Sequence, residues 1–156
     1  MALELDRMLE GLPEKITTTF YAAFSRFEYA MMQSHFLTVR PRAAPNWDKL
    51  AIALGEGFFQ QAAPHVPTLV NDPPKKLIVR HGRPAFGPRP EPATSTSELL
   101  QYARRVRNNL FHGNKMFAAN RQRDEHLIRE VLWLIEFILE KDHDLRGAFH
   151  EPQTPF

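Results

Sequence analysis

The chain of 156 residues contains no cysteine. This absence excludes disulfide bonds and thiolate metal sites, and it fits a reducing compartment. Long apolar runs are also missing, because the longest, residues 131–139, is interrupted by Glu136 and is far too short to span a bilayer. The N-terminal segment 1–12 alternates charged residues with leucines and lacks the apolar core of a signal peptide. We therefore expect a soluble, cytoplasmic protein that does not enter a membrane.

Several catalytic signatures are absent as well. The chain has no Walker A loop, no dinucleotide-binding glycine pattern and no nucleophile elbow of the kind found in serine hydrolases. Six histidines show no metal-ligand spacing such as His-Glu-x-x-His: His35, His65, His81, His126, His143 and His150. We therefore expect neither a metal nor another cofactor.

Hydrophobic residues recur every three or four positions in four segments, which indicates four amphipathic helices. The expected helices cover about 13–39, 46–61, 97–112 and 120–141. Pro41 is expected to end the first, Asn46 to cap the second, and Ser95 or Ser97 to cap the third. The expected apolar side of the third helix consists of Leu99, Leu100, Ala103, Val106, Leu110 and Phe111. The length suits one domain, so we predict a small all-α bundle of four to five helices over residues 1–156.

Residues 63–96, between the second and third helices, contain eight of the thirteen prolines, which forbids a long helix there. In this proline-rich insertion, Leu77–Val79 is predicted as one arm of a short β-hairpin with His81 and Gly82 in its turn; an irregular loop is the alternative. Residues 142–156 are expected to form a tail that is loosely ordered or docked on a partner. The charged segments 124–126 and 141–144 are expected to be solvated.

The segment RVRNNLFHGNK, residues 105–115, lies in a basic part of the chain. Six basic residues and no acidic residue occur between Arg104 and Arg123, which is the charge pattern expected around an anionic ligand. One interpretation is an ordinary helix ending, in which His112 precedes a left-handed glycine, Gly113. The alternative interpretation is a phosphate-binding site built from Arg107 and His112.

The second interpretation has a clear chemistry. Arg107 supplies a planar cation suited to phosphate oxygens, and His112 supplies an imidazole with an ordinary pKa of about 6.5. Asn108 can orient either group. On a straight helix Arg107 and His112 are separated by about 7.5 Å of rise and about 140° of rotation, so they do not share a face. Joint action therefore requires a helix break at Gly113, or a two-fold dimer that brings two copies of the segment together.

The string RNNLFHG, residues 107–113, resembles the signature of the HEPN superfamily (higher eukaryotes and prokaryotes nucleotide-binding domain). That signature is an arginine, often followed by asparagine, then four intervening residues and a histidine near the end of the third main helix of an all-α bundle. The segments SRFEYA (25–30) and NWDKL (46–50) are also similar to bacterial stand-alone members. The resemblance covers the chain except the proline-rich insertion.

The resemblance implies a metal-independent endoribonuclease that works as a homodimer, without a cofactor, and leaves 2′,3′-cyclic phosphate and 5′-hydroxyl ends. Arg107 would contact the phosphate, Asn108 would be its polar companion, and His112 would act as acid and base. Such enzymes serve as toxins or anti-phage effectors, so a neutralising antitoxin is a possible partner. The alternative is a non-catalytic HEPN-type dimer that binds RNA, nucleotide or a protein.

Three further residues are weaker candidates. Arg104 lies one helical turn before Asn108, so it is placed to contact an RNA backbone. Lys115 follows Gly113 and is either a phosphate contact or an ordinary loop lysine. Glu28 borders the apolar stripe of the first helix, where it is either a solvated residue or a carboxylate that orients Arg107.

Overall fold

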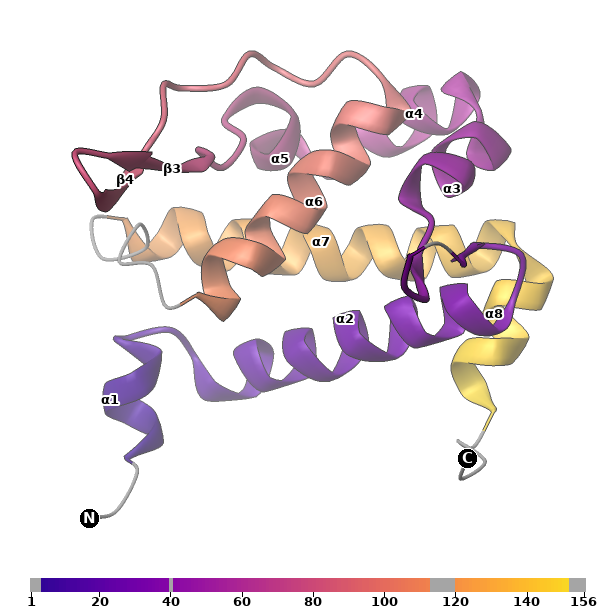
Figure 1. Cartoon of the computed structure of the whole chain (residues 1–156), viewed down its shortest axis with the longest axis horizontal. Coiled ribbons are helices and arrows are strands. Elements are labelled where there is room, and N and C mark those ends of the chain that lie inside the picture. Colours follow the sequence, from indigo (N-terminus) through magenta and orange to yellow (C-terminus); the bar gives the residue numbers. More distant parts are fainter. Residues whose placement is uncertain (1–3, 40, 113–119, 152–156) are drawn as a thin grey trace.

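The computed structural model describes residues 4–39, 41–112 and 120–151. Over these ranges the chain is mostly helical, with eight α-helices, one 3-10 turn and two small antiparallel sheets (Figure 1). The predicted all-α class is confirmed in this broad sense. The predicted number of four to five helices is wrong, because a glycine divides one expected helix and because both terminal segments and the proline-rich insertion contain short helices.

The first expected helix is shorter than predicted. A short helix, α1 (Leu5–Leu9), is followed by a turn at Glu10 and Gly11, both at positive φ, and then by α2 (Glu14–Gln33). The expected end near residue 39, set by Pro41, is wrong. The backbone N–H groups of Ser34 and Phe36 both donate to the Met31 carbonyl and turn the chain. Two short strands, β1 (Leu37–Thr38) and β2 (Ala44–Pro45), then pair before the next helix.

The second expected helix, 46–61, is two helices. Asn46 caps α3 (Trp47–Leu54) as predicted, since its side chain accepts a hydrogen bond from the Lys49 N–H. Gly55 then adopts a φ of 72°, which a helix does not allow, and α4 (Glu56–Ala62) begins. The 3-10 turn η1 (Ala63–His65) and α5 (Pro67–Asn71) follow inside the proline-rich insertion.

A side chain from a distant helix caps α5. The Glu130 carboxylate accepts hydrogen bonds from the backbone N–H groups of Thr68 (3.0 Å) and Leu69 (2.7 Å). These N–H groups lie in the first turn of α5, where no partner exists within the helix. Glu130 belongs to α7 (Arg121–Lys141), so the cap also ties the insertion to the body of the fold.

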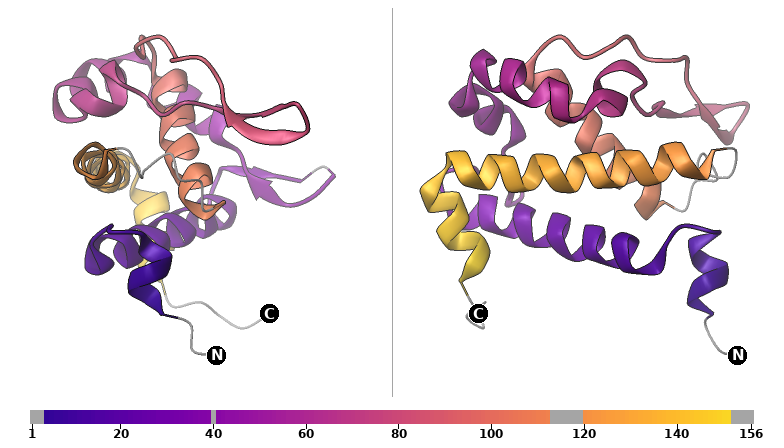
Figure 2. Two further views of the ribbon diagram at one scale, coloured as in Figure 1. Left: turned by 90° about the vertical axis from the view of Figure 1, so that its left-hand side faces the viewer. Right: turned by 180° about the vertical axis from the view of Figure 1, so that it is seen from behind.

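The predicted hairpin in the insertion is confirmed. Strands β3 (Leu77–Arg80) and β4 (Arg83–Phe86) pair in antiparallel register, with Leu77 opposite Phe86 and Arg80 opposite Arg83. His81 and Gly82 form the two-residue turn, both at positive φ, as tight hairpins require. In the left panel of Figure 2 this β3–β4 hairpin projects from the helical body.

The last three helices are positioned by capping side chains and by packing in the helical body. Ser95, one of the two predicted candidates, caps α6 (Thr96–Phe111), and Asn120 caps α7. Residues 143–150 form α8 (His143–His150), so the expectation of a loose tail is wrong for this segment. Leu145 of α8 is buried, and Arg26 of α2 donates to the Phe149 carbonyl (2.7 Å).

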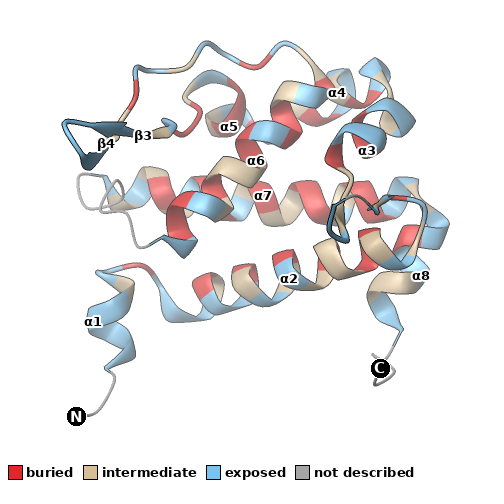
Figure 3. Ribbon diagram, in the orientation of Figure 1, coloured by how far each residue is buried: buried red, intermediate tan, exposed pale blue. Residues whose placement is uncertain are grey.

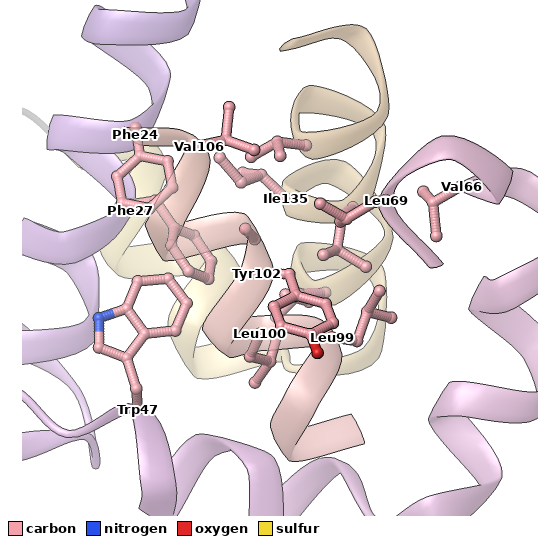
Figure 4. Packing of buried hydrophobic residues seen from close by; sticks show 14 of the residues in the cluster. Phe24, Phe27, Trp47, Val66, Leu69, Leu99, Leu100, Tyr102, Val106 and Ile135 are labelled. Carbon is pink, nitrogen blue, oxygen red and sulfur yellow. The ribbon is translucent and has the colours of Figure 1, made fainter. Parts of the chain in front are cut away.

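The core lies between α2, α6 and α7, as the buried residues in Figure 3 show. In Figures 1 and 2, α2 and α7 run side by side and α6 crosses beside them. The rings of Phe24 and Phe27 pack against Trp47 with centroid distances of 5.7 and 5.6 Å (Figure 4). The apolar side predicted for the third helix, α6, is buried except at Phe111, which is 69% exposed. None of the described helices is long and apolar enough to cross a membrane.

Candidate nucleic-acid interface

The motif lies at the C-terminal end of α6. The helix ends at Phe111, and the His112 N–H still donates to the Asn108 carbonyl (3.0 Å). The backbone of His112 therefore continues the hydrogen-bond pattern of the helix and does not turn away from the helix at this residue. The expected break at Gly113 and the candidate Lys115 lie outside the described residues.

Arg107 faces α2. Its Nη2 atom donates to Glu28 Oε1 at 2.8 Å, and the two side chains are only 29% and 22% exposed. The guanidinium carbon also lies 5.3 Å from the centroid of the Phe24 ring, a cation–π arrangement. The contact predicted between Glu28 and Arg107 is thus present. Because the Glu28 carboxylate and the Phe24 ring hold the guanidinium from two directions, Arg107 is oriented before any ligand arrives.

A groove of about 390 Å³ lies on another side of α6, against the start of the β3–β4 hairpin. Its lining residues include no acidic side chain: Lys76, Leu77, Gln101, Arg104, Arg105, Asn108, Asn109 and His112. The structure therefore brings together three of the predicted residues, Asn108, His112 and Arg104. Arg107 is not among the lining residues, which agrees with the helical arithmetic for a straight helix.

Two side chains of α6 fix the wall of the groove formed by the insertion. Arg105 Nη1 donates to the Pro74 carbonyl and Asn109 Nδ2 donates to the Lys75 carbonyl, each at 3.1 Å. Both carbonyls lack a strand partner, so these bonds hold the segment just before β3 against the helix. Asn109 is buried. Only Asn108 was singled out from the sequence. The second asparagine of the motif, Asn109, was the one signal available for the contact with the Lys75 carbonyl.

Arg104 and Arg105 keep the groove positively charged. The Arg104 guanidinium carbon lies 5.6 Å from the Trp47 ring centroid, and that of Arg105 lies 5.1 Å from the Tyr102 ring centroid. Burial lowers the pKa of Arg105, but an arginine guanidinium stays charged in proteins. Because each guanidinium is supported by an aromatic ring and no carboxylate lines the groove, both charges are available to an anion.

An exposed aromatic residue adjoins the motif. Phe111 packs edge-on against Tyr21 of α2, with a centroid distance of 5.7 Å, and the rest of its ring faces solvent. The Tyr21 hydroxyl donates to the Leu110 carbonyl (3.1 Å), and burial raises the pKa of Tyr21. The sequence predicted a core position for Phe111, because its spacing matches the apolar stripe. Instead it shares the side of α6 that carries Arg107.

Asp124, near the start of α7, corrects another expectation. The segment 124–126 was expected to be solvated, but Asp124 is 1% exposed. Neither of its carboxylate oxygens accepts a hydrogen bond within the described part of the chain. Burial raises the pKa of Asp124 to about 7, although the neighbouring Arg123 and Arg121 charges oppose the shift. The periodicity of α7 places this residue on the buried side together with Leu127 and Val131.

The side chains present suit binding of a phosphate group and transfer of a proton, but one chain places them on different sides of α6. An imidazole and an amide face a basic groove, whereas the oriented guanidinium lies on the side of the helix that faces α2. Over residues 4–39, 41–112 and 120–151, no three His, Asp or Glu side chains gather in a way that would hold a metal ion. Comparison of the chain with protein-family models, with curated proteins and with solved structures finds no match.

Proposed function

We propose that the chain is a metal-independent endoribonuclease of the HEPN type that acts as a homodimer. The observation that carries the proposal is the groove in which His112 and Asn108 meet Arg104 and Arg105 without any acidic side chain. Such a groove attracts a phosphodiester, and it places beside it an imidazole, a side chain that can accept or donate a proton. The HEPN-like spacing of Arg107, Asn108 and His112 supports the same assignment.

The reaction needs a base, an acid and a stabiliser for the charge that develops on phosphorus. A neutral His112 removes the proton of the ribose 2′-hydroxyl as the 2′-oxygen attacks phosphorus. The bond from phosphorus to the 5′-oxygen breaks, and a protonated His112 from the second protomer delivers a proton to that leaving oxygen. Arg107 stabilises the extra negative charge on the non-bridging oxygens. The products are a 2′,3′-cyclic phosphate and a 5′-hydroxyl.

The positions of Arg107 and His112 support the proposed dimer. One chain presents them on different sides of α6, and a two-fold axis near the end of this helix would place Arg107 of one protomer beside His112 of its partner. The exposed Phe111 ring, on the Arg107 side, supplies apolar surface for that contact.

The first test is cleavage of mixed RNA in the presence of a chelator. The parent should cleave and leave cyclic phosphate ends, with a bell-shaped dependence of rate on pH because one His112 must be neutral and the other protonated. Arg107→Ala and His112→Ala should each abolish cleavage, whereas His126→Ala, at an exposed histidine of α7, should not. Cleavage that survives in both motif variants, or an inactive parent, would refute the enzyme.

A second test asks whether the two His112 copies act across the dimer. Parent chains are mixed with an excess of His112→Ala chains, dissociated and allowed to reassociate. A mixed dimer holds only one His112, so it lacks either the base or the acid, and the activity falls with the square of the fraction of parent chains. If His112 acts within one chain, the activity falls only in proportion to that fraction.

The second candidate function is a non-catalytic HEPN-type dimer that binds RNA through the same groove. The ion pair with Glu28 favours it, because a guanidinium already neutralised by a carboxylate is less free to contact phosphate. Expression in bacteria separates the candidates. Growth arrest relieved by His112→Ala indicates a toxin-like enzyme and a need for a neutralising partner, whereas harmless expression with retained RNA binding indicates the module.

A further inference from the structure

We infer that the β3–β4 hairpin is a second wall of the RNA site, and that a single-stranded RNA runs from the groove on α6 onto the hairpin. This inference extends the proposed function, which concerns only the motif on α6. It assigns a role to the proline-rich insertion, which the resemblance to HEPN proteins does not cover.

The charge distribution is the first observation. Residues 73–90 contain five basic residues and no acidic one: Lys75, Lys76, Arg80, Arg83 and Arg89. Residues 99–123 form a second stretch without acidic residues. These stretches are distant in sequence but share one groove, where Lys76 and Leu77 face Arg104 and His112. The basic surface around the motif is therefore built from two parts of the chain, and one of them is the hairpin.

The tip of the hairpin is the second observation. Arg80 and Arg83 are directly opposite each other in the register, and both are exposed. Like charges at this position destabilise a strand pair. No carboxylate forms an ion pair with either residue in the described part of the chain. An anion bound between the two arginines would remove this repulsion.

The spacing along the strand shows how the two sites connect. Arg80 lies three residues beyond Leu77, which lines the groove, and this corresponds to about 10 Å along a strand. Because side chains alternate between the two faces of a strand, Arg80 and Arg83 lie on the face of the hairpin opposite the Leu77 side chain. The hairpin projects from the helical body (Figure 2), so its arginines extend the basic surface outward from the groove. A single strand that leaves the groove must therefore cross the edge of the hairpin to reach the two arginines, which a flexible chain can do and a stiff duplex cannot.

The groove favours a single strand over a duplex. Gln101 and Asn108 present exposed amide groups within it. Side-chain amides can bond the edges of bases that are splayed out, and such edges are accessible in single-stranded RNA but not in the deep major groove of an RNA duplex. The phosphates would contact the arginines and lysines, while the amides contact bases.

The decisive variant is Arg80→Glu. It places opposite charges across the strand pair with Arg83, which stabilises the hairpin, so a loss of RNA binding cannot be due to unfolding of the hairpin. Binding is measured in a His112→Ala background, which prevents cleavage, with a labelled single-stranded RNA and with a duplex of the same sequence. The matched control is Arg146→Glu, an equal charge change at an exposed position of α8.

Arg80→Glu should weaken binding of the single strand by about fivefold or more, and Arg146→Glu by much less. Arg80→Gln, which removes one phosphate contact, should reduce the slope of log Kd against log salt by about 0.7. The duplex should bind more weakly than the single strand. Equal effects of the two glutamate variants, an unchanged salt slope, or tighter binding of the duplex would overturn the inference.

The same experiment separates this inference from the proposed function. If the parent cleaves RNA but the hairpin variants bind as well as the control, the inference fails and the enzyme stands. If the parent does not cleave RNA, but Arg80→Glu weakens RNA binding, the proposed enzymatic function is refuted and the hairpin remains a binding surface.

Discussion

Arg107 on α6 donates a hydrogen bond to Glu28 on α2, with an Nη2–Oε1 distance of 2.8 Å, although the residues are 79 positions apart in sequence. The Phe24 ring supports the same guanidinium. The pair is partly screened from water, so it fixes the direction in which Arg107 points.

Glu28→Gln is expected to lower kcat about tenfold or more, because the carboxylate that orients the Arg107 guanidinium is lost; carboxylates that orient metal ligands contribute about that much. Stability should change by no more than about 1 kcal/mol, since the pair is partly exposed. Glu28→Asp should recover part of the rate. The control is Glu14→Gln, an exposed glutamate on the same helix. A rate unaffected by Glu28→Gln would show that the ion pair is not used in positioning.

Phe111→Ser is expected to weaken the dimer while leaving the monomer folded. The Phe111 ring is mostly in water in the single chain, so its removal costs the fold little, whereas an interface centred on it would lose a large apolar contact. Sedimentation velocity over a range of concentrations measures the effect. Ile52→Ser, at an exposed position of α3, should leave the dimer intact. Equal dimer affinity for both variants would place the interface elsewhere.

Asp124 should make stability depend on pH. Its pKa rises from 3.8 to about 7 on folding because of burial, so between pH 4 and pH 7 the folded state holds a proton that the unfolded state has lost. Stability is therefore highest below about pH 4 with respect to this group and falls as the pH rises to about 7. The loss is roughly 2 to 4 kcal/mol.

Asp124→Asn removes this titration, so the fall in stability over that pH range should largely disappear. Urea denaturation at several pH values measures the slope, and Asp48→Asn, an exposed aspartate of α3, should leave it unchanged. A parent and an Asp124→Asn variant with the same pH profile would contradict the assignment.

Glu130→Gln should destabilise the chain by about 1 to 2 kcal/mol, because two backbone N–H groups of α5 lose a charged acceptor. Hydrogen exchange should show the largest loss of protection at these two amides of α5. Glu140→Gln, an exposed glutamate on the same helix, is the matched control. If both variants denature at the same urea concentration, the cap contributes nothing measurable.

Local patterns in the sequence identified most of the regular structure. The stripes through Phe24 and Val131, the caps at Asn46 and Ser95, and the hairpin turn at His81 and Gly82 all depend on residues within a few positions of one another. Such features are readable from spacing and residue type. The division of the second helix at Gly55, where φ is 72°, was not predicted, because the apolar spacing continues across this residue.

Features that depend on distant partners were not predictable in the same way. The cap that Glu130 forms on α5, the bond from Asn109 to the Lys75 carbonyl and the burial of Asp124 all join parts of the chain that have no fixed spacing. The candidate site combines features that local patterns indicated with features that depend on distant partners. The contact between Glu28 and Arg107 was one of the two alternatives that the sequence left open for Glu28, whereas the wall formed by the insertion was not predicted.

The segment that leads into the β3–β4 hairpin is held by side chains at its base and left free at its tip. Arg105 and Asn109 of α6 and Arg123 of α7 bond the carbonyls of Asp72, Pro73, Pro74 and Lys75. Substitutions at the base therefore perturb the fold, while substitutions at Arg80 or Arg83 alter only an exposed turn. The tip can consequently change in sequence without any change in the packing of the helical core.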